Sequence, residues 1–592
     1  MKKHLMIFPA LGCLLILASG CTKLLDVKPL NQITSDAVWK DASLMQAYVN
    51  NIYRGLGFGE FNSTSGLSDL DDESVWTNGA HAVVQSTITS SNRDVFGGSR
   101  FNYLDWGSLY SYIRQCNVFL TETTGSSVDT AQLNRMKGEV YFLRAYFYQN
   151  LMRTYGGVPL ITKVYGLDDS TAIARNTFAE TITFIVDNCD SAAALLPLSY
   201  SGDNLGRATR GAAMALKSRV LLYAASDLYN LDPSGIPELG YPNASASDRH
   251  ARWEAAQEAA KAVMDLGIYH LYDADPAPGD STAENYSNLF LSKTNDEVIL
   301  SRFASVNNKA PNVGLWFSPN GYDGYGENSP IQQMVDAYEM RDGSKFSWNN
   351  PAEAAHPYQN RDPRFYATIF YDGARWIKRH SDAASFDPVG IIQTFKTITL
   401  PDGSTLPGID TRNGPVENWN GSYSNYYLRK FVDPSNDFLS ASQEIPWPFM
   451  RYAEILLNYA EASIELGQYQ VARDALNQIR RRAGMPEFGP SLTGDQLMSE
   501  YRNERRVELA FECQRFFDIR RWMIAPKVMN EDAQGIEIAV KGKDRADRST
   551  YYDYRYKVID IQPRHWDDKM YFLPIAFDEM QRNPKLIQNP GF

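Results

Sequence analysis

The chain of 592 residues is long enough for about four domains of ordinary size, although a helical repeat array reaches this length as a single unit. Its hydrophobic fraction of 44% and charged fraction of 22% are typical of a folded globular protein and exclude a disordered chain. The formal net charge of −12 disfavours a nucleic acid as a partner and suits an uncharged or basic ligand.

The N-terminus carries the pattern of a secretion signal. Lys2 and Lys3 precede an apolar run over residues 5–17, which is shorter than the roughly 20 residues that a membrane-spanning helix needs. The run ends in LASGC (residues 17–21), and small residues directly before a cysteine resemble the bacterial lipoprotein signal. We therefore predict a signal peptide over residues 1–20, lipidation of Cys21, and a mature chain tethered to a membrane by acyl chains.

The mature chain is predicted to be mostly α-helical. Apolar residues recur at helical spacing in segments that begin at Trp106, Met136, Ala213, Trp253 and Ala453. Residues 451–486 show the spacing of a tetratricopeptide helix pair, and we expect about four such pairs from separated parts of the chain. The segment 503–522 is predicted as one helix with the ion pairs Arg505–Glu508 and Glu512–Arg515 along one face.

The middle of the chain has a different character. Between residues 231 and 444, Gly, Pro, Asn and Asp become frequent, and short apolar runs such as residues 297–300 indicate strands. We predict a single domain over residues 21–592, in which this loop-rich region is inserted into a helical scaffold of about residues 21–230 and 445–592. Binding function is expected on such loops, because a rigid scaffold positions them.

Five motifs follow one another along the chain. They are LLDVKP (residues 24–29), RAYFYQNLMRTYGGVPL (144–160), ALKSRVLLYAASDLYN (215–230), NERRVELAFECQRFFDIRRW (503–522) and the terminal FLPIAFDEMQRNPKLIQNPGF (572–592). Together they resemble the SusD/RagB family of outer-membrane nutrient-binding lipoproteins from Bacteroidota. The terminal motif departs from the family pattern at Ala576, where proline is usual, and at Phe592, where tyrosine is usual.

The resemblance implies a fold and a function. Members of the family have a helical scaffold with four tetratricopeptide-like units and a variable loop region that holds the ligand. They sit on the surface of the outer membrane as a lid over a SusC-like TonB-dependent transporter. They capture glycans, or peptides in the RagB-like branches, and deliver them to that channel without acting as enzymes. No cofactor is expected.

Two segments offer the side chains that grip a sugar. A sugar ring is held by flat aromatic faces together with polar groups that bond its hydroxyls. The segments 71–79 and 315–325 combine aromatic residues with Gly, Pro and Asn, and by their position they resemble the family's ligand-binding loops. We expect Trp76 and Trp316 to stack on sugar faces, Asn78 and Asn320 to bond hydroxyls, and the two tyrosines of the second loop to do either, namely Tyr322 and Tyr325.

Signals for catalysis or a metal are weak. The sequence contains no HExxH, GxSxG or Walker motif. The acidic run Asp71, Asp72 and Glu73 does not fit the spacing of an EF-hand, so a structural Ca²⁺ has no support and a solvated turn is predicted. Two alternatives to glycan binding stay open, a peptide-binding RagB-like protein and a surface glycoside hydrolase. Capture of peptides would identify the first alternative, and release of reducing sugar by the protein alone would identify the second.

Overall fold

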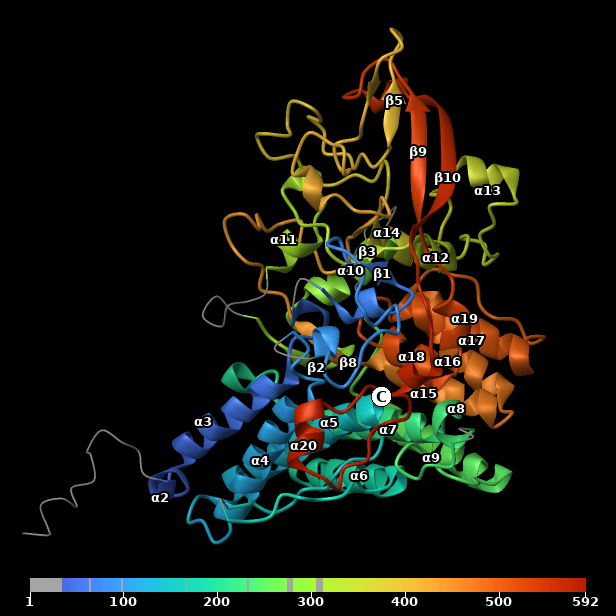
Figure 1. Ribbon diagram of the computed structural model, residues 1–592. Helices are drawn as coiled ribbons and strands as arrows, with labels where there is room; N and C mark the ends of the chain where they lie inside the picture. Colours follow the sequence, from blue (N-terminus) through green and yellow to red (C-terminus); the bar gives the residue numbers. More distant parts are fainter. Residues whose placement is uncertain are drawn as a thin grey trace, which may run out of the picture.

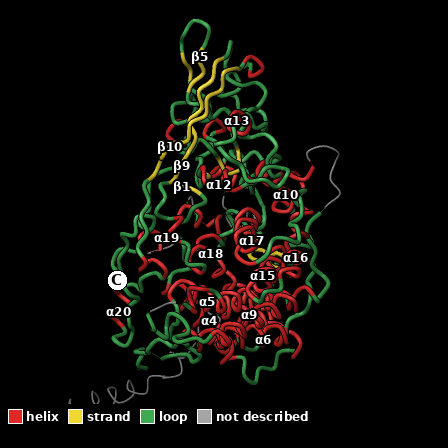
Figure 2. The backbone as a smooth tube through the Cα atoms, turned by 90° about the vertical axis from the view of Figure 1, so that its right-hand side faces the viewer, coloured by secondary structure: helices red, strands yellow, loops and turns green. Residues whose placement is uncertain are grey.

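The computed structural model describes residues 35–62, 65–96, 100–166, 168–231, 234–273, 281–304 and 312–592. The predicted signal peptide and Cys21 lie outside these residues. Long helices fill the lower half of the molecule, and loops with short strands rise above them (Figure 1). The view turned by 90° shows the same separation (Figure 2). Within the described ranges, no helix combines the length and the apolar character needed to cross a membrane.

The helices of the N-terminal region begin where polar side chains cap them. The side chains of Asp, Thr or Ser accept hydrogen bonds from first-turn amides of the long helices, at Asp41, Asp105, Asp129, Thr177, Thr209 and Ser245. The helices are α2 (Ser35–Val38), α3 (Ala42–Tyr53), α4 (Trp106–Glu122), α5 (Thr130–Tyr155), α6 (Phe178–Leu195), α7 (Arg210–Ala225), α8 (Asp227–Asn230) and α9 (Ala246–Met264). The helices predicted from apolar spacing in this region are confirmed as α4, α5, α7 and α9.

The C-terminal region completes the same helical scaffold. Its helices are α15 (Tyr452–Glu465), α16 (Tyr469–Arg482), α17 (Gly494–Glu508), α18 (Arg515–Arg521), α19 (Ala525–Val528) and α20 (Phe577–Arg582). The predicted helix pair in residues 451–486 is confirmed as α15 and α16, which pack against each other across a turn at Gly467, where φ is +72°. Because α9 packs against α15, one continuous stack of helices joins the chain before and after the loop-rich region.

The loop-rich region contains short elements only. Its helices are α10 (Ser281–Leu291), α11 (Val313–Phe317), α12 (Gln332–Ala337), α13 (Pro351–Ala355) and α14 (Pro363–Thr368). Its strands are β2 (Val298–Arg302), β3 (Ser329–Pro330), β4 (Ile369–Phe370), β5 (Thr397–Thr399), β6 (Thr405–Leu406) and β7 (Tyr427–Leu428). The predicted strand at residues 297–300 is confirmed as β2, which pairs antiparallel with β8 (Trp447–Arg451) at the entrance to α15.

One segment assigned to the helical scaffold forms strands instead. The strands β9 (Ala533–Lys541) and β10 (Tyr552–Gln562) pair antiparallel and rise away from the helices toward the loops (Figure 1). With β5 and β6 they form a sheet in the order β10-β9-β5-β6. Alternating residues of β9, such as Ile536, Ile538 and Val540, are buried. This period of two residues is that of a strand, which explains why the segment is not helical.

The predicted helix over residues 503–522 is also wrong, because the chain turns inside it. The helix α17 ends at Glu508, and α18 begins only at Arg515. Between them Phe511 and Cys513 have φ of 60° and 59°, a left-handed conformation that ends a helix. The amide of Phe511 donates to the Glu73 carboxylate at 3.2 Å, so a distant side chain replaces the helical acceptor.

The ion pairs of this motif therefore differ from the predicted ones. Arg505 donates to Asp518 at 2.8 Å, rather than pairing with Glu508. Arg515 donates to Asp72 at 2.7 Å, rather than pairing with Glu512. The predicted pairs assumed a continuous helix, and the turn removes the geometry that would have aligned them.

Glu508 lies at the centre of a buried network of charges. Its two oxygens accept hydrogen bonds from Arg451 at 2.6 Å, from Arg364 at 2.9 Å and from Arg482. Burial alone would raise the pKa of Glu508, but these three guanidinium groups hold it well below its usual range. The network ties the C-terminal helices to β8 and to the loop-rich region, and so gives the loops a rigid base.

Candidate ligand-binding site

The acidic run that precedes the first predicted loop is buried, not solvated as the sequence suggested. Asp71, Asp72 and Glu73 are at most 4% exposed. The Asp72 carboxylate accepts hydrogen bonds from Arg515 at 2.7 and 2.8 Å and lies 3.0 Å from Arg506. The positive charges of two arginines therefore compensate this carboxylate. Among the described residues, no group of three His, Cys, Asp or Glu side chains is placed to hold a metal ion.

The structure brings the two predicted loops together. The strand β1 (Ser74–Val75) pairs antiparallel with β3, with Val75 opposite Ser329. Just beyond β1, the Thr77 hydroxyl donates to the Gly326 carbonyl at 2.5 Å. The Asn78 amide donates to Glu327 Oε1 at 3.1 Å. Two segments about 250 residues apart in the chain thus form one continuous surface.

The predicted ligand residues differ in how far their side chains are exposed to solvent. Asn78 is exposed, and Tyr325 is 39% exposed, so both face solvent on the joined loops. Trp76 is half-buried, because its ring stacks on His81 with the ring centres 4.7 Å apart. Trp316 is half-buried and packs against the hydrophobic core from α11, a short helix where we expected an irregular loop.

Asn320 and Tyr322 hold the second loop together instead of facing a ligand. Both side chains are fully buried. Asn320 donates to the Val416 carbonyl at 2.7 Å and accepts from the Tyr427 hydroxyl at 2.6 Å. The Tyr322 hydroxyl donates to the Ile377 carbonyl at 3.0 Å. Their polar atoms are used inside the protein because this loop, unlike a solvated one, is packed on both sides, and we do not retain them as ligand contacts.

Sequence reasoning missed two exposed aromatic residues. Trp419 is 63% exposed and Tyr423 is 40% exposed. Trp419 lies in a 3-10 turn, η8 (Asn418–Asn420), which contacts the turn η7 (Asn320–Tyr322) of the second loop. The sequence NWNGSY at residues 418–423 has the same mixture of aromatic residues with Asn, Gly and Ser that identified the other two loops, so the signal was present.

The turn that carries Trp419 approaches the backbone next to Tyr325. A Cβ atom on Gly326 would lie 2.6 Å from the Asn420 carbonyl oxygen, so the two backbones are in contact there. We call the exposed set Asn78, Tyr325, Trp419 and Tyr423 the aromatic surface. The guanidinium of Arg412 covers the Tyr423 ring at 4.0 Å, which fixes the orientation of that ring.

A buried carboxyl group supports this surface from below. Glu327 is 3% exposed and accepts the hydrogen bond of Asn78. Burial, together with the charge of Asp69, raises the pKa of Glu327 to about 8. Below about pH 8 the neutral carboxyl form therefore predominates, and it accepts the hydrogen bond from Asn78.

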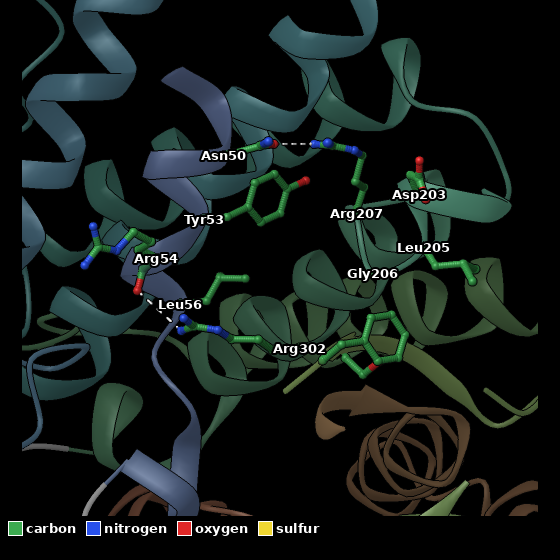
Figure 3. Close-up of a pocket in the computed structure, with 11 residues that line it drawn as sticks. Asn50, Tyr53, Arg54, Leu56, Asp203, Leu205, Gly206, Arg207 and Arg302 are labelled. Atoms are coloured by element: carbon green, nitrogen blue, oxygen red, sulfur yellow. Dashed lines mark hydrogen bonds between the residues drawn. The ribbon is translucent and has the colours of Figure 1, made fainter. Parts of the chain in front are cut away.

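A separate cavity of about 280 Å³ lies between the end of α3 and β2 (Figure 3). Arg207 donates to Asn50 at 3.0 Å there, and Arg302 donates to the Gly57 carbonyl at 2.7 Å. These guanidinium groups are already bonded within the protein, and the residues of the aromatic surface do not line this cavity. The cavity is therefore a weaker candidate for the ligand than the joined loops.

Comparisons with known proteins agree with this architecture. Residues 287–592 match the profile of the SusD family, and residues 23–222 match a profile described as starch-binding, associating with outer membrane. The SusD-like protein P25 of Formosa agariphila is 22% identical over 96% of this chain and 95% of its own.

Solved structures show the same fold. A SusD-like protein from Bacteroides fragilis superposes with a TM-score of 0.74 at 28% identity, covering 95% of this chain and all of that one. Surface glycan-binding protein A from Bacteroides fluxus superposes with a TM-score of 0.59 at 18% identity, covering 93% of this chain and 99% of that one. With two family profiles that together match most of the chain and a helical scaffold shared along its length, this protein belongs to the SusD/RagB family.

Proposed function

We propose that the protein is a cell-surface lipoprotein that binds glycans at the aromatic surface and delivers them to a SusC-like TonB-dependent transporter in the outer membrane. The observation that carries the proposal is the union of three separate loops into one exposed set of aromatic and amide side chains on a rigid helical base. Such a set matches the apolar faces and hydroxyl rims of sugar rings. The glycan-binding name of the Bacteroides fluxus neighbour supports the same reading.

The role proposed is binding rather than catalysis. The exposed groups of the aromatic surface are rings and an amide, which orient a ligand but do not transfer protons at neutral pH. A glycosidase needs two carboxyl groups that face each other across the scissile bond. Glu327, the carboxyl group that is hydrogen-bonded to this surface, is buried and accepts the Asn78 amide.

Calorimetric titration against a panel of polysaccharides tests whether the protein binds glycans. Trp419→Ala and Tyr325→Ala should each weaken glycan binding by about tenfold, or about 1.4 kcal/mol, because each removes a ring that stacks on sugar. Tyr552→Ala is the matched control, since Tyr552 is 56% exposed on β10, away from the joined loops. Binding of peptides with no binding of any glycan would overturn the proposal in favour of a peptide-binding function.

Fractionation of cells tests whether a lipid on Cys21 anchors the protein to the outer membrane. Cys21→Ser should move the protein from the outer-membrane fraction to the soluble fraction, because the acyl chains are lost. Cys13→Ser is the matched control, since this cysteine lies inside the apolar run of the signal. Retention of the Cys21→Ser variant in the membrane would contradict the proposed lipid anchor.

Co-purification of the wild-type protein with a TonB-dependent transporter from solubilised outer membranes tests the proposed transporter partner.

A further inference from the structure

Two turns that carry the aromatic surface also carry carboxylates. Asp323 follows η7 and lies two residues before Tyr325, and Glu417 lies two residues before Trp419. Because η7 and η8 are in contact, the two carboxylates lie on neighbouring turns. Desolvation, followed by the charges of Asp323 and Asp382, raises the pKa of Glu417, so these two carboxylates act on Glu417 electrostatically.

A fourth carboxylate completes the cluster on the side of His380. The His380 ring lies 2.7 Å from Asp323 Oδ2 through Nδ1 and 3.9 Å from Asp437 Oδ1 through Nε2. Asp382 is exposed and Asp437 has a side chain that is 58% exposed. We call Asp323, Asp382, Glu417 and Asp437 the acidic rim.

Few basic groups are available to neutralise the acidic rim. Within the described part of the chain, neither Asp382 nor Glu417 has a basic nitrogen within 4.0 Å, and His380 is the base that faces the other two carboxylates. The neighbouring Arg379 is buried and forms ion pairs with Asp387 and Asp410. Arg412 donates to the Gly421 carbonyl at 2.8 Å and keeps its positive charge beside Tyr423, so it offsets part of the charge of the four carboxylates.

We propose that the acidic rim makes the aromatic surface selective for charge, so that it binds glycans bearing protonated amino groups in preference to neutral glycans and rejects glycans bearing carboxylate or sulfate. The inference rests on the proposed function, because it assigns a substrate class to the same surface. A sugar that stacks on Tyr325 or Trp419 brings its substituents next to the carboxylates of the same turns. A protonated amine there is attracted, and an acidic substituent is repelled.

The test compares oligosaccharides of one length that differ in charge: oligomers of glucosamine, of N-acetylglucosamine and of galacturonate, together with the neutral polysaccharides of the panel. Dissociation constants are measured by calorimetry at about pH 6, where the carboxylates carry charge and the amine is protonated, and at two salt concentrations of about 50 and about 500 mM. We expect the glucosamine oligomer to bind at least about fivefold tighter than its N-acetylated counterpart at low salt, and this preference to shrink at high salt.

A double variant and a control variant test whether the acidic rim is the source of the preference for the amine. The double variant Asp382→Asn, Glu417→Gln should remove most of the preference for the amine while leaving the affinity for a neutral glycan within about twofold. Glu254→Gln is the control, since this carboxylate is exposed on α9 and far from the loops. Asp382 and Glu254 are exposed and Glu417 is partly exposed, so we expect these changes to have little effect on folding, which is checked by thermal melting.

The outcomes separate this inference from the proposed function. Binding of neutral glycans that depends on Trp419, without any preference for the amine, would overturn the charge selectivity and leave glycan binding standing. Binding of the galacturonate oligomer as tight as that of the glucosamine oligomer at low salt would also overturn it. Absence of binding to every glycan would overturn both. An amine preference that survives in the double variant would show that the acidic rim is not its source.

Discussion

The ion pair between Asp72 and two arginines predicts a measurable loss of stability when its charge is removed. Asp72→Asn keeps the size of the side chain but leaves the guanidinium groups of Arg515 and Arg506 buried without their carboxylate. Breaking a buried ion pair by removing one partner costs about 3–5 kcal/mol. With an unfolding entropy of about 2.1 cal/mol/K per residue, a mature chain of about 570 residues should lose about 3–4 °C in Tm.

Differential scanning calorimetry measures this loss, and an exposed pair provides the control. Asp190→Asn makes the same change in an ion pair with Lys217, where the aspartate side chain is 54% exposed, and it should cost no more than about 1 kcal/mol. The arginines lower the pKa of Asp72 below its usual range, so its contribution is present above about pH 4 and is lost as the pH falls below that value. Equal Tm shifts for the two variants at neutral pH would refute the reasoning.

Two further predictions concern the joined loops. Glu327→Gln keeps an acceptor for Asn78 but removes a carboxyl whose pKa is raised to about 8. The wild-type protein should lose stability as the pH rises from about 4.5 through 8, because its folded state holds this proton more tightly than the unfolded state. In thermal melts over that range, the Tm of the variant should fall less than that of the wild type. A smaller fall in the wild type would contradict the prediction. Gly326→Ala, at φ +59°, would also place a Cβ 2.6 Å from the Asn420 carbonyl, so it should weaken glycan binding in titrations. Gly403→Ala, at φ +84° with open space around it, should cost only about 1 kcal/mol of stability and leave binding unchanged, whereas equal effects of the two alanines on binding would refute the contact.

The sequence predicted the helical part of the fold well because its signals are local. Apolar residues such as Leu109 and Ile113 recur at helical spacing, and a polar cap such as Asp105 stands directly before the helix that they form. The same locality explains the failure at residues 503–522. The apolar pattern there is compatible with one helix, but the turn around Phe511 depends on Glu73, which is more than 400 residues away in the chain.

The candidate site was only half predictable for a related reason. Mixed aromatic and polar composition identified the loops of Asn78 and Tyr325, and the same criterion, applied to residues 418–423, would have identified Trp419. Composition does not reveal burial, however. Asn320 and Tyr322 have the residue types of a ligand contact, yet they are enclosed by segments whose proximity no local sequence pattern indicates.

By itself, the sequence determined that this protein is a mostly helical member of a recognisable family, and it predicted binding loops between residues 231 and 444 and in the segment after residue 70. Those properties depend on periodicity, caps and motifs, which are read along the chain. Only the tertiary structure decided that three loops meet in one aromatic surface, that the acidic run at residues 71–73 is buried against arginines, and that carboxylates border the site. These features arise from pairings between residues hundreds of positions apart, whose burial and charge compensation exist only once the chain has folded.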